Sequence, residues 1–398
     1  MFQNQYKYYK NPKVSILDPA YYFAKCFALL SISKISKNHN RILVSPFESN
    51  RGMEFYTISY LSFAYTSLSI LVMAFTFQQC VLFINYPCVG MSDCAAWILT
   101  ASHSILSIIL LVTSMSRTKA CIDCFNKARE LLAWNPNDDS DFHWTALNFI
   151  FFLAILLARC LCAVLARSSA SIHTRGAFYL YILCLIYPIA VECVVCSLCY
   201  VIQVALEKIN QRLTFIHQLQ FKESKVISLH IEEFMDLHWK SFELAFHTTK
   251  TFGVDLLFDL AFSMIWFVIY VYITIASLAN LNTTEVSSSE EMTREIFRNA
   301  GLFLELMFVT LRIFYICHRA QQMSTPAQKS IKILRDLGRG NHLKDGCRKL
   351  IDAYSTQILE RKMKLEACDF FTVDMSFIHG IVGVATTYLI VFIQYNTS

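Results

Sequence analysis

Seven apolar segments, each about 20 residues or longer, constrain this chain more than any other feature of its sequence. A helix needs about 20 mostly apolar residues to cross the hydrocarbon core of a membrane. The segments lie at 57–84, 94–115, 145–166, 177–205, 253–279, 298–317 and 377–395. Because a helix satisfies its own backbone hydrogen bonds in lipid, these segments predict an all-α membrane protein with seven transmembrane helices.

The balance of side chains supports the same conclusion. Apolar residues make up 55% of the chain and charged residues 16%, whereas soluble proteins carry about 25% charged residues. We therefore expect a multi-pass membrane protein in contact with membrane lipid. The sequence has no basic run with interleaved aromatic residues, so it predicts no nucleic-acid partner.

Lysine and arginine lie almost entirely on one side of the predicted spans. There are eight before the first span, four in 116–144, six in 206–252 and eleven in 318–376. The alternate loops together contain three. Because basic loops favour the cytoplasm, the N-terminus is predicted to be cytoplasmic and the C-terminus extracellular. This orientation excludes G-protein-coupled receptors, whose N-terminus is extracellular.

Two glycosylation sequons give a separate indication of orientation. They begin at Asn282 and Asn396, and both fall on the predicted outer side. We expect a glycoprotein modified at Asn282, since Asn396 is close to the membrane and to the end of the chain.

The last predicted helix carries a recognisable motif. Thr387 and Tyr388 are followed by five apolar residues and then by Gln394 and Tyr395. This pattern resembles the C-terminal signature of insect gustatory receptors, in which Thr-Tyr, five apolar residues and Gln-Phe follow one another. Tyr395 replaces the usual Phe. The preceding stretch ACDFFTVDMSF also resembles the family's approach to its last helix.

The resemblance implies the insect chemoreceptor channel fold, which gustatory receptors share with the related insect odorant receptors. It implies a tastant-gated, non-selective cation channel for sensory transduction, built as a homotetramer or heterotetramer of gustatory receptors. The implied organisation is a cytoplasmic region at 1–56, six helices with an outer ligand pocket at 57–317, a cytoplasmic anchor at 318–376, and a pore helix with a short extracellular tail at 377–398.

One position bears on the ligand. Sugar receptors of the family tend to carry an acidic residue after Thr-Tyr, and Leu389 stands there. The resemblance therefore favours a bitter-type or other non-sugar small molecule. Two alternatives stay open: a ligand-specificity subunit that needs a co-receptor to conduct, and a small-molecule transporter.

The last helix has residues suited to a pore. Thr387, Val391, Gln394 and Tyr395 share one stripe at helical spacing. Together with the resemblance, this stripe predicts that Gln394 faces a water-filled pore and that a ring of Val391 gates it by dewetting. The alternative is that Gln394 bonds to a neighbouring helix.

Charged residues within a membrane span are costly unless paired, and four of those within the other predicted spans lie at matching depths. Their depths predict two candidate ion pairs, Arg159–Glu305 and Glu192–Arg312. Two interpretations stay open. In the first, both pairs hold helices together; in the second, Arg159 and Glu305 face the ligand pocket. Aromatic side chains in the outer halves of the spans are further pocket candidates. They are Trp97, His103, Tyr179, Tyr187, Trp266 and Tyr270.

Other chemistry has little support in the sequence. There is no phosphate-binding loop, nucleophile elbow or HExxH motif, so we expect no enzyme activity and no cofactor. Cys121 and Cys124 form a lone CxxC without a second pair, so we expect no metal site. A disulfide between Cys88 and Cys94 stays open.

Overall fold

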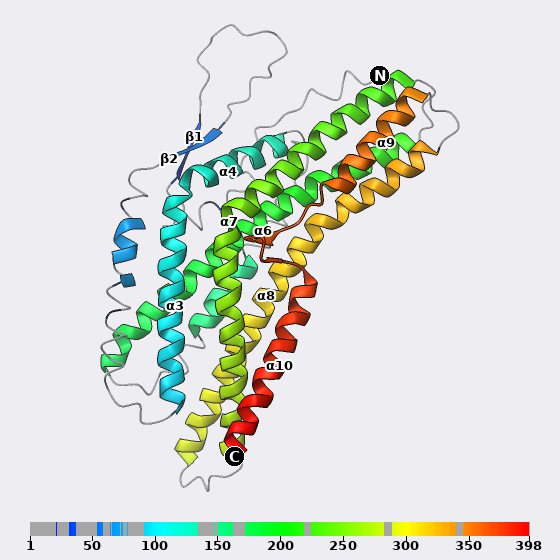
Figure 1. Ribbon diagram of the computed structural model, residues 1–398. Coiled ribbons are helices and arrows are strands. Elements are labelled where there is room, and N and C mark those ends of the chain that lie inside the picture. Colours follow the sequence, from blue (N-terminus) through cyan, green and yellow to red (C-terminus); the bar gives the residue numbers. More distant parts are fainter. Residues whose placement is uncertain are drawn as a thin grey trace.

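The protein is described by a computed structural model that is helical over most of its length (Figure 1). It describes residues 32–36, 54–58, 91–133, 150–161, 172–218, 224–281, 289–339 and 345–397, with isolated residues between 64 and 78 and at 21 and 147. Nearly all of these residues are helical, which confirms the predicted all-α class.

Most of the helices overlap predicted apolar segments. Their bounds are α3 (Met91–Ser116), α4 (Thr118–Ala133), α6 (Ile172–Gln218), α7 (Ser224–Leu281), α8 (Ser289–Gly338), α9 (Asp345–Glu360) and α10 (Met375–Thr397). A further apolar helix, Ile150–Leu161, precedes α6 in the sequence. Every predicted span from residue 94 onward therefore contains helix, whereas the first, at 57–84, lies mostly outside the described residues.

Three helices are much longer than a membrane is thick. α6, α7 and α8 contain 47, 58 and 50 residues. At 1.5 Å per residue they extend about 70–87 Å, whereas the hydrocarbon core is about 30 Å thick. Their predicted cytoplasmic ends group with α9, while α10 runs beside α7 and α8 at the opposite end (Figure 1). Each long helix therefore belongs both to a bundle of predicted membrane spans, here called the membrane bundle, and to a bundle of predicted cytoplasmic ends, here called the cytoplasmic bundle.

Length and composition identify the membrane-crossing helices. Within the described residues, the apolar parts of α6, α7 and α8 are each long enough to cross a membrane. The pair α3 and α4 is a further candidate, interrupted by a bend of 73° at Arg117. These helices show a protein that crosses the membrane several times.

α6 lies at the centre of the bundle. In its most apolar stretch, 94% of the residues are buried, whereas the share is 39% in the corresponding stretches of α7 and α8. α6 packs against α3, α4, α7 and α8. α8 by contrast exposes Phe303, Leu311 and Phe314. The exposed faces of α7 and α8 are thus suited to contact lipid or another chain.

Among the residues that the structure describes, two strand pairs interrupt the helical architecture. β1 (Ile32–Ser36) pairs antiparallel with β2 (Glu54–Ile58), with Lys34 opposite Tyr56. Since β2 includes residues 57 and 58, the predicted start of the first span at residue 57 is wrong. The aromatic and β-branched residues of EFYTI favour a strand there.

The second pair joins the predicted anchor to the predicted pore helix. β3 (Glu366–Ala367) and β4 (Phe371–Thr372) form an antiparallel hairpin between α9 and α10. Cys368 and Asp369 turn the chain with left-handed φ angles of 52° and 61°. α9 and α10 are therefore separate helices connected by a tight hairpin.

Candidate functional site

Both predicted membrane ion pairs are present. Arg159 Nε donates to Glu305 Oε2 of α8 at 2.8 Å. Arg312 Nε of α8 lies 3.0 Å from Glu192 Oε1 of α6. All four residues are buried. Because an isolated charge is costly in this environment, each pair favours the association of the helices that carry it.

Arg312 has a further acidic partner that the sequence reasoning missed. Its Nη2 atom donates to Asp259 Oδ1 of α7 at 3.2 Å and also contacts Ser263 Oγ. Arg312 thus joins α6, α7 and α8. The signal that would have found this partner is the presence of Asp255 and Asp259, four residues apart, within the predicted fifth span.

Two of the pocket candidates touch each other beside this cluster. The rings of His103 and Trp266 are stacked, with centroids 3.6 Å apart and an interplanar angle of 2°. His103 Nδ1 lies 2.6 Å from the Leu99 carbonyl oxygen, and Trp266 Nε1 donates to Ser102 Oγ at 2.8 Å. The Arg312 guanidinium lies 5.8 Å from the Trp266 ring centroid. The stack therefore connects α3 to the charged cluster.

The remaining pocket candidates divide into two groups. Tyr187 and Tyr270 are buried at 6% and 3% exposure. The side chains of Trp97 and Tyr179 lie outside the described residues, although both positions are helical. All the described candidates are therefore packed inside the bundle, and their contact with a ligand stays a prediction.

α10 presents a continuous exposed face, here called the α10 stripe. It consists of Gly380, Gly383, Thr387, Val391 and Gln394, which follow one another at i+3 or i+4 and are all exposed. A carbon added at either glycine would meet no atom within 4 Å. Three of the four predicted pore residues, Thr387, Val391 and Gln394, thus share one face of α10. The two glycines continue this face toward the N-terminal end of the helix.

Several predicted features lie outside the described residues. They are the Tyr395, Cys88 and Cys94 side chains and the glycosylation site Asn282. Cys121 and Cys124 are described, and both are buried in α4. Among the described residues, no group of three or more His, Cys, Asp or Glu side chains is placed to hold a metal ion.

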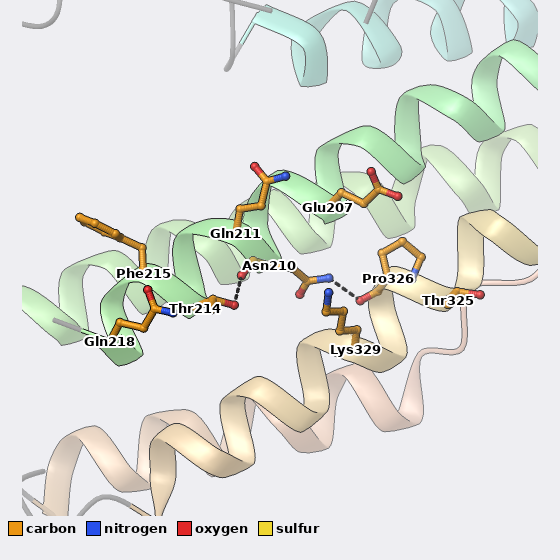
Figure 2. A pocket seen from close by; sticks show the side chains of 9 residues that line it. All are labelled: Glu207, Asn210, Gln211, Thr214, Phe215, Gln218, Thr325, Pro326 and Lys329. Atoms are coloured by element: carbon orange, nitrogen blue, oxygen red, sulfur yellow. Dashed lines mark hydrogen bonds between the residues drawn. The ribbon is translucent and has the colours of Figure 1, made fainter. Parts of the chain in front are cut away.

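A groove with a volume of about 730 Å³ lies between α6 and α8 in the cytoplasmic bundle. Figure 2 shows its lining, which is Glu207, Asn210, Gln211, Thr214, Phe215, Gln218, Thr325, Pro326 and Lys329. Asn210 Nδ2 donates to the Pro326 carbonyl at 2.8 Å, and Ser330 Oγ donates to Asn210 Oδ1 at 2.6 Å. These bonds join α6 to α8, so the groove is distinct from the outer pocket predicted within the membrane.

The chain was compared with known families and structures. The family described as 7tm chemosensory receptor matches residues 17–397. The insect olfactory receptor OR5 from Machilis hrabei has a similar structure, with a TM-score of 0.67, 14% identity, and coverage of 95% of this chain and 97% of that chain. For the same receptor in complex with eugenol, the TM-score is 0.66, the identity 13%, and the coverage 96% and 97%.

These similarities carry different information. The likeness to OR5 extends over nearly the full length of both chains. Because the sequence identity is low, it shows a shared fold. A comparison with curated proteins found no match. The family match covers almost the whole sequence and confirms the insect chemoreceptor resemblance of the C-terminal motif. This chain belongs to the 7tm chemosensory receptor family.

Proposed function

We propose that this chain is a gustatory receptor that forms a tastant-gated, non-selective cation channel in the plasma membrane. The observation that carries the proposal is the α10 stripe, whose Thr387 and Gln394 are exposed within a membrane helix. Lipid is a poor environment for an amide, and a water-filled path is a favourable one. In a homotetramer or heterotetramer, four copies of this stripe would line one central path.

The residues of the α10 stripe have complementary roles in such a path. Thr387 and Gln394 would contact water and permeating cations. Val391, which is 55% exposed in the single chain, would form an apolar ring that closes the path by dewetting. A ligand that binds the open state more tightly than the closed state would shift the population toward conduction.

The proposed ligand is a bitter-type or other non-sugar small molecule. Leu389 supports this choice, because the resemblance links sugar recognition to an acidic residue at that position. The structure of OR5 in complex with eugenol supports a small organic ligand by analogy. Eugenol therefore belongs in the first panel of test compounds, beside bitter compounds and sugars.

The test is patch recording from cells that express the full chain alone, in outside-out patches without GTP. We expect a ligand-evoked cation current whose rectification or block changes in Gln394→Ala. The matched control is Gln357→Ala, because Gln357 lies on α9 outside the membrane helices. A current unchanged by Gln394→Ala would remove α10 from the pore.

Two other outcomes would identify the alternatives. Uptake of the ligand without current would indicate a transporter. Current that appears only when a second receptor is co-expressed would indicate a specificity subunit that depends on a co-receptor.

A further inference from the structure

The hairpin between α9 and α10 is seated directly on the backbone of α7. A carbon added at Gly253 would lie 3.1 Å from Cys368 N, 3.3 Å from the Glu366 carbonyl oxygen and 3.6 Å from Cys368 Sγ. The two backbone distances are shorter than ordinary van der Waals contact. Since the neighbouring atoms belong to the backbone, they cannot move aside as a flexible side chain can. A glycine is therefore needed here for close approach.

Further bonds hold the hairpin in this position. Thr249 Oγ1, one helical turn before Gly253, donates to the Lys364 carbonyl at 3.1 Å. The backbone N–H of Val373 donates to the Leu365 carbonyl at 2.8 Å and closes the base of the hairpin. Leu365 and Val373 are both buried. The hairpin is thus a packed element with a defined contact on α7.

The same turn of α7 also holds the bend between α3 and α4. Arg117, at the bend, donates to the Thr251 carbonyl and pairs with the Asp255 carboxylate. Thr113, near the end of α3, donates to the same carboxylate. Thr251 and Asp255 lie on either side of Gly253 in the sequence. One short stretch of α7 therefore contacts two elements that are distant in the sequence.

These two elements lead to different parts of the molecule. α3 carries His103, which is stacked on Trp266 beside the charged cluster in the membrane. The hairpin continues directly into α10, which packs on α7 and α8. A displacement of α3 relative to α7 would therefore reach the inner end of α10 through residues 249–255 and the hairpin.

We propose that residues 249–255 of α7, here called the seat, couple the α3–α4 bend to the hairpin. When the bend moves, the hairpin moves with it and shifts the inner end of α10. Gly253 is the positioning residue, because it lets the hairpin approach the α7 backbone closely. The contacts of the seat do not depend on whether the chain conducts ions. Their effect on channel gating rests on the proposed function. Gly253 acts through the hairpin.

Cys368 is a reporter for this seat. Its thiol is half-buried over Gly253, and burial raises its pKa, so the docked thiol should react slowly. The experiment uses the purified full chain in lipid nanodiscs, a charged maleimide, and mass spectrometry of the peptide that contains Cys368. In Gly253→Ala we expect labelling about tenfold faster, because overpacking against backbone displaces the hairpin.

Two variants make the comparison specific. Gly346→Ala is the matched control, because a carbon added there meets no atom within 4 Å, and its labelling should equal that of the wild type. Thr249→Val removes the bond to Lys364 without adding bulk and should also accelerate labelling. Equal labelling in the wild type, Gly253→Ala and Thr249→Val would overturn the seat.

Arg117→Gln tests the coupling through the seat. The substitution removes the contacts of Arg117 with Thr251 and Asp255 and so loosens the α3–α4 bend. The Arg117 charge also lowers the pKa of the Cys368 thiol, so its loss alone would slow labelling. Faster Cys368 labelling would therefore support the coupling, and unchanged or slower labelling would overturn it. Labelling does not depend on current. A wild type that conducts neither alone nor with a co-expressed receptor, but shows the expected labelling pattern, would therefore refute the channel proposal alone. A conducting wild type with uniform labelling would refute the seat alone.

Discussion

Arg159 Nε and Glu305 Oε2 lie 2.8 Å apart, although 146 positions separate the two residues in the sequence. The contact ties the helix Ile150–Leu161 to α8 within the membrane bundle. The side chains are 1% and 10% exposed, so water screens the pair weakly. Because the partners come from different helices, the contact fixes how these helices face each other.

Reversal of this pair tests its contribution to stability. Arg159→Glu and Glu305→Arg should each destabilise the protein by about 3–5 kcal/mol, because each leaves like charges buried together. The double reversal should recover much of that loss. The measurement is the thermal unfolding midpoint of the purified protein in nanodiscs. A double variant as unstable as the single variants would show that the two side chains do not interact as an isolated pair.

Arg312 should be more sensitive than either of its acidic partners. Arg312→Met leaves Glu192 and Asp259 buried together without their cation, whereas Asp259→Asn leaves the Arg312–Glu192 pair intact. We expect Arg312→Met to destabilise by about 3–5 kcal/mol and Asp259→Asn by clearly less. The fraction of folded protein that is recovered after mild heating compares the destabilisation in the two variants. An equal or larger loss in Asp259→Asn would contradict the central position of Arg312.

The sequence allowed the ion pairs to be predicted because lipid leaves few ways to satisfy a charge. Depth in the membrane limited the partners of Arg159 and Arg312 to a small set, and both predicted pairs are confirmed. Asp259 was missed because Arg312 already had an acid at matching depth. Only the packing of α7 between the other helices brings this second acid to the same guanidinium.

The strand pairs were harder to predict for local reasons. The turn of the β3–β4 hairpin uses Cys368 and Asp369 in left-handed conformations, where a glycine would have been the usual signal. Its strands have two residues each, so no alternation of polar and apolar residues can develop. The role of Gly253 depends on a contact with residues more than 100 positions away, which a single sequence does not reveal.

The cytoplasmic bundle should lose stability in acid because of His238. This residue lies on α7 outside the predicted span, and its ring is 5.8 Å from the Tyr354 ring of α9 in an edge-on arrangement. The Tyr354 hydroxyl donates to the Phe234 carbonyl at 3.0 Å and holds α9 against α7. Burial lowers the pKa of His238 to about 4, because a charged imidazole would be poorly solvated there.

The direction of the pH effect follows from this pKa. The unfolded chain takes up a proton at His238 near pH 6.5, while the folded chain resists protonation until about pH 4. Stability should therefore fall by up to about 3 kcal/mol as pH drops through this window, with no further contribution below it. The measurement is the unfolding midpoint at pH values from about 7.5 to about 4, which bracket this window. In His238→Phe the midpoint should no longer fall across the window.

A second histidine on α7 gives the control for this effect. The His230 side chain is 45% exposed, so His230→Phe should leave the pH slope in place. If both variants keep the slope of the wild type, other groups control the acid sensitivity of the bundle.

Adjacent threonines on α10 offer the sharpest test of the pore face. The hydroxyl of Thr387 donates to the Gly383 carbonyl at 3.0 Å, and that of Thr386 donates to the Val382 carbonyl at 2.8 Å. The two side chains therefore have the same local chemistry, but they point about 100° apart around the helix. Only Thr387 belongs to the α10 stripe.

If the α10 stripe lines the path, Thr387→Val should lower the single-channel conductance roughly twofold, because four hydroxyls become methyl groups at one level of the pore. Thr386→Val makes the same chemical change away from the stripe, so the conductance should match the wild type. Each substitution conserves volume and removes one local bond, so folding should be affected equally in both variants. A larger effect at Thr386 than at Thr387 would mean that a different face of α10 meets the permeating ions.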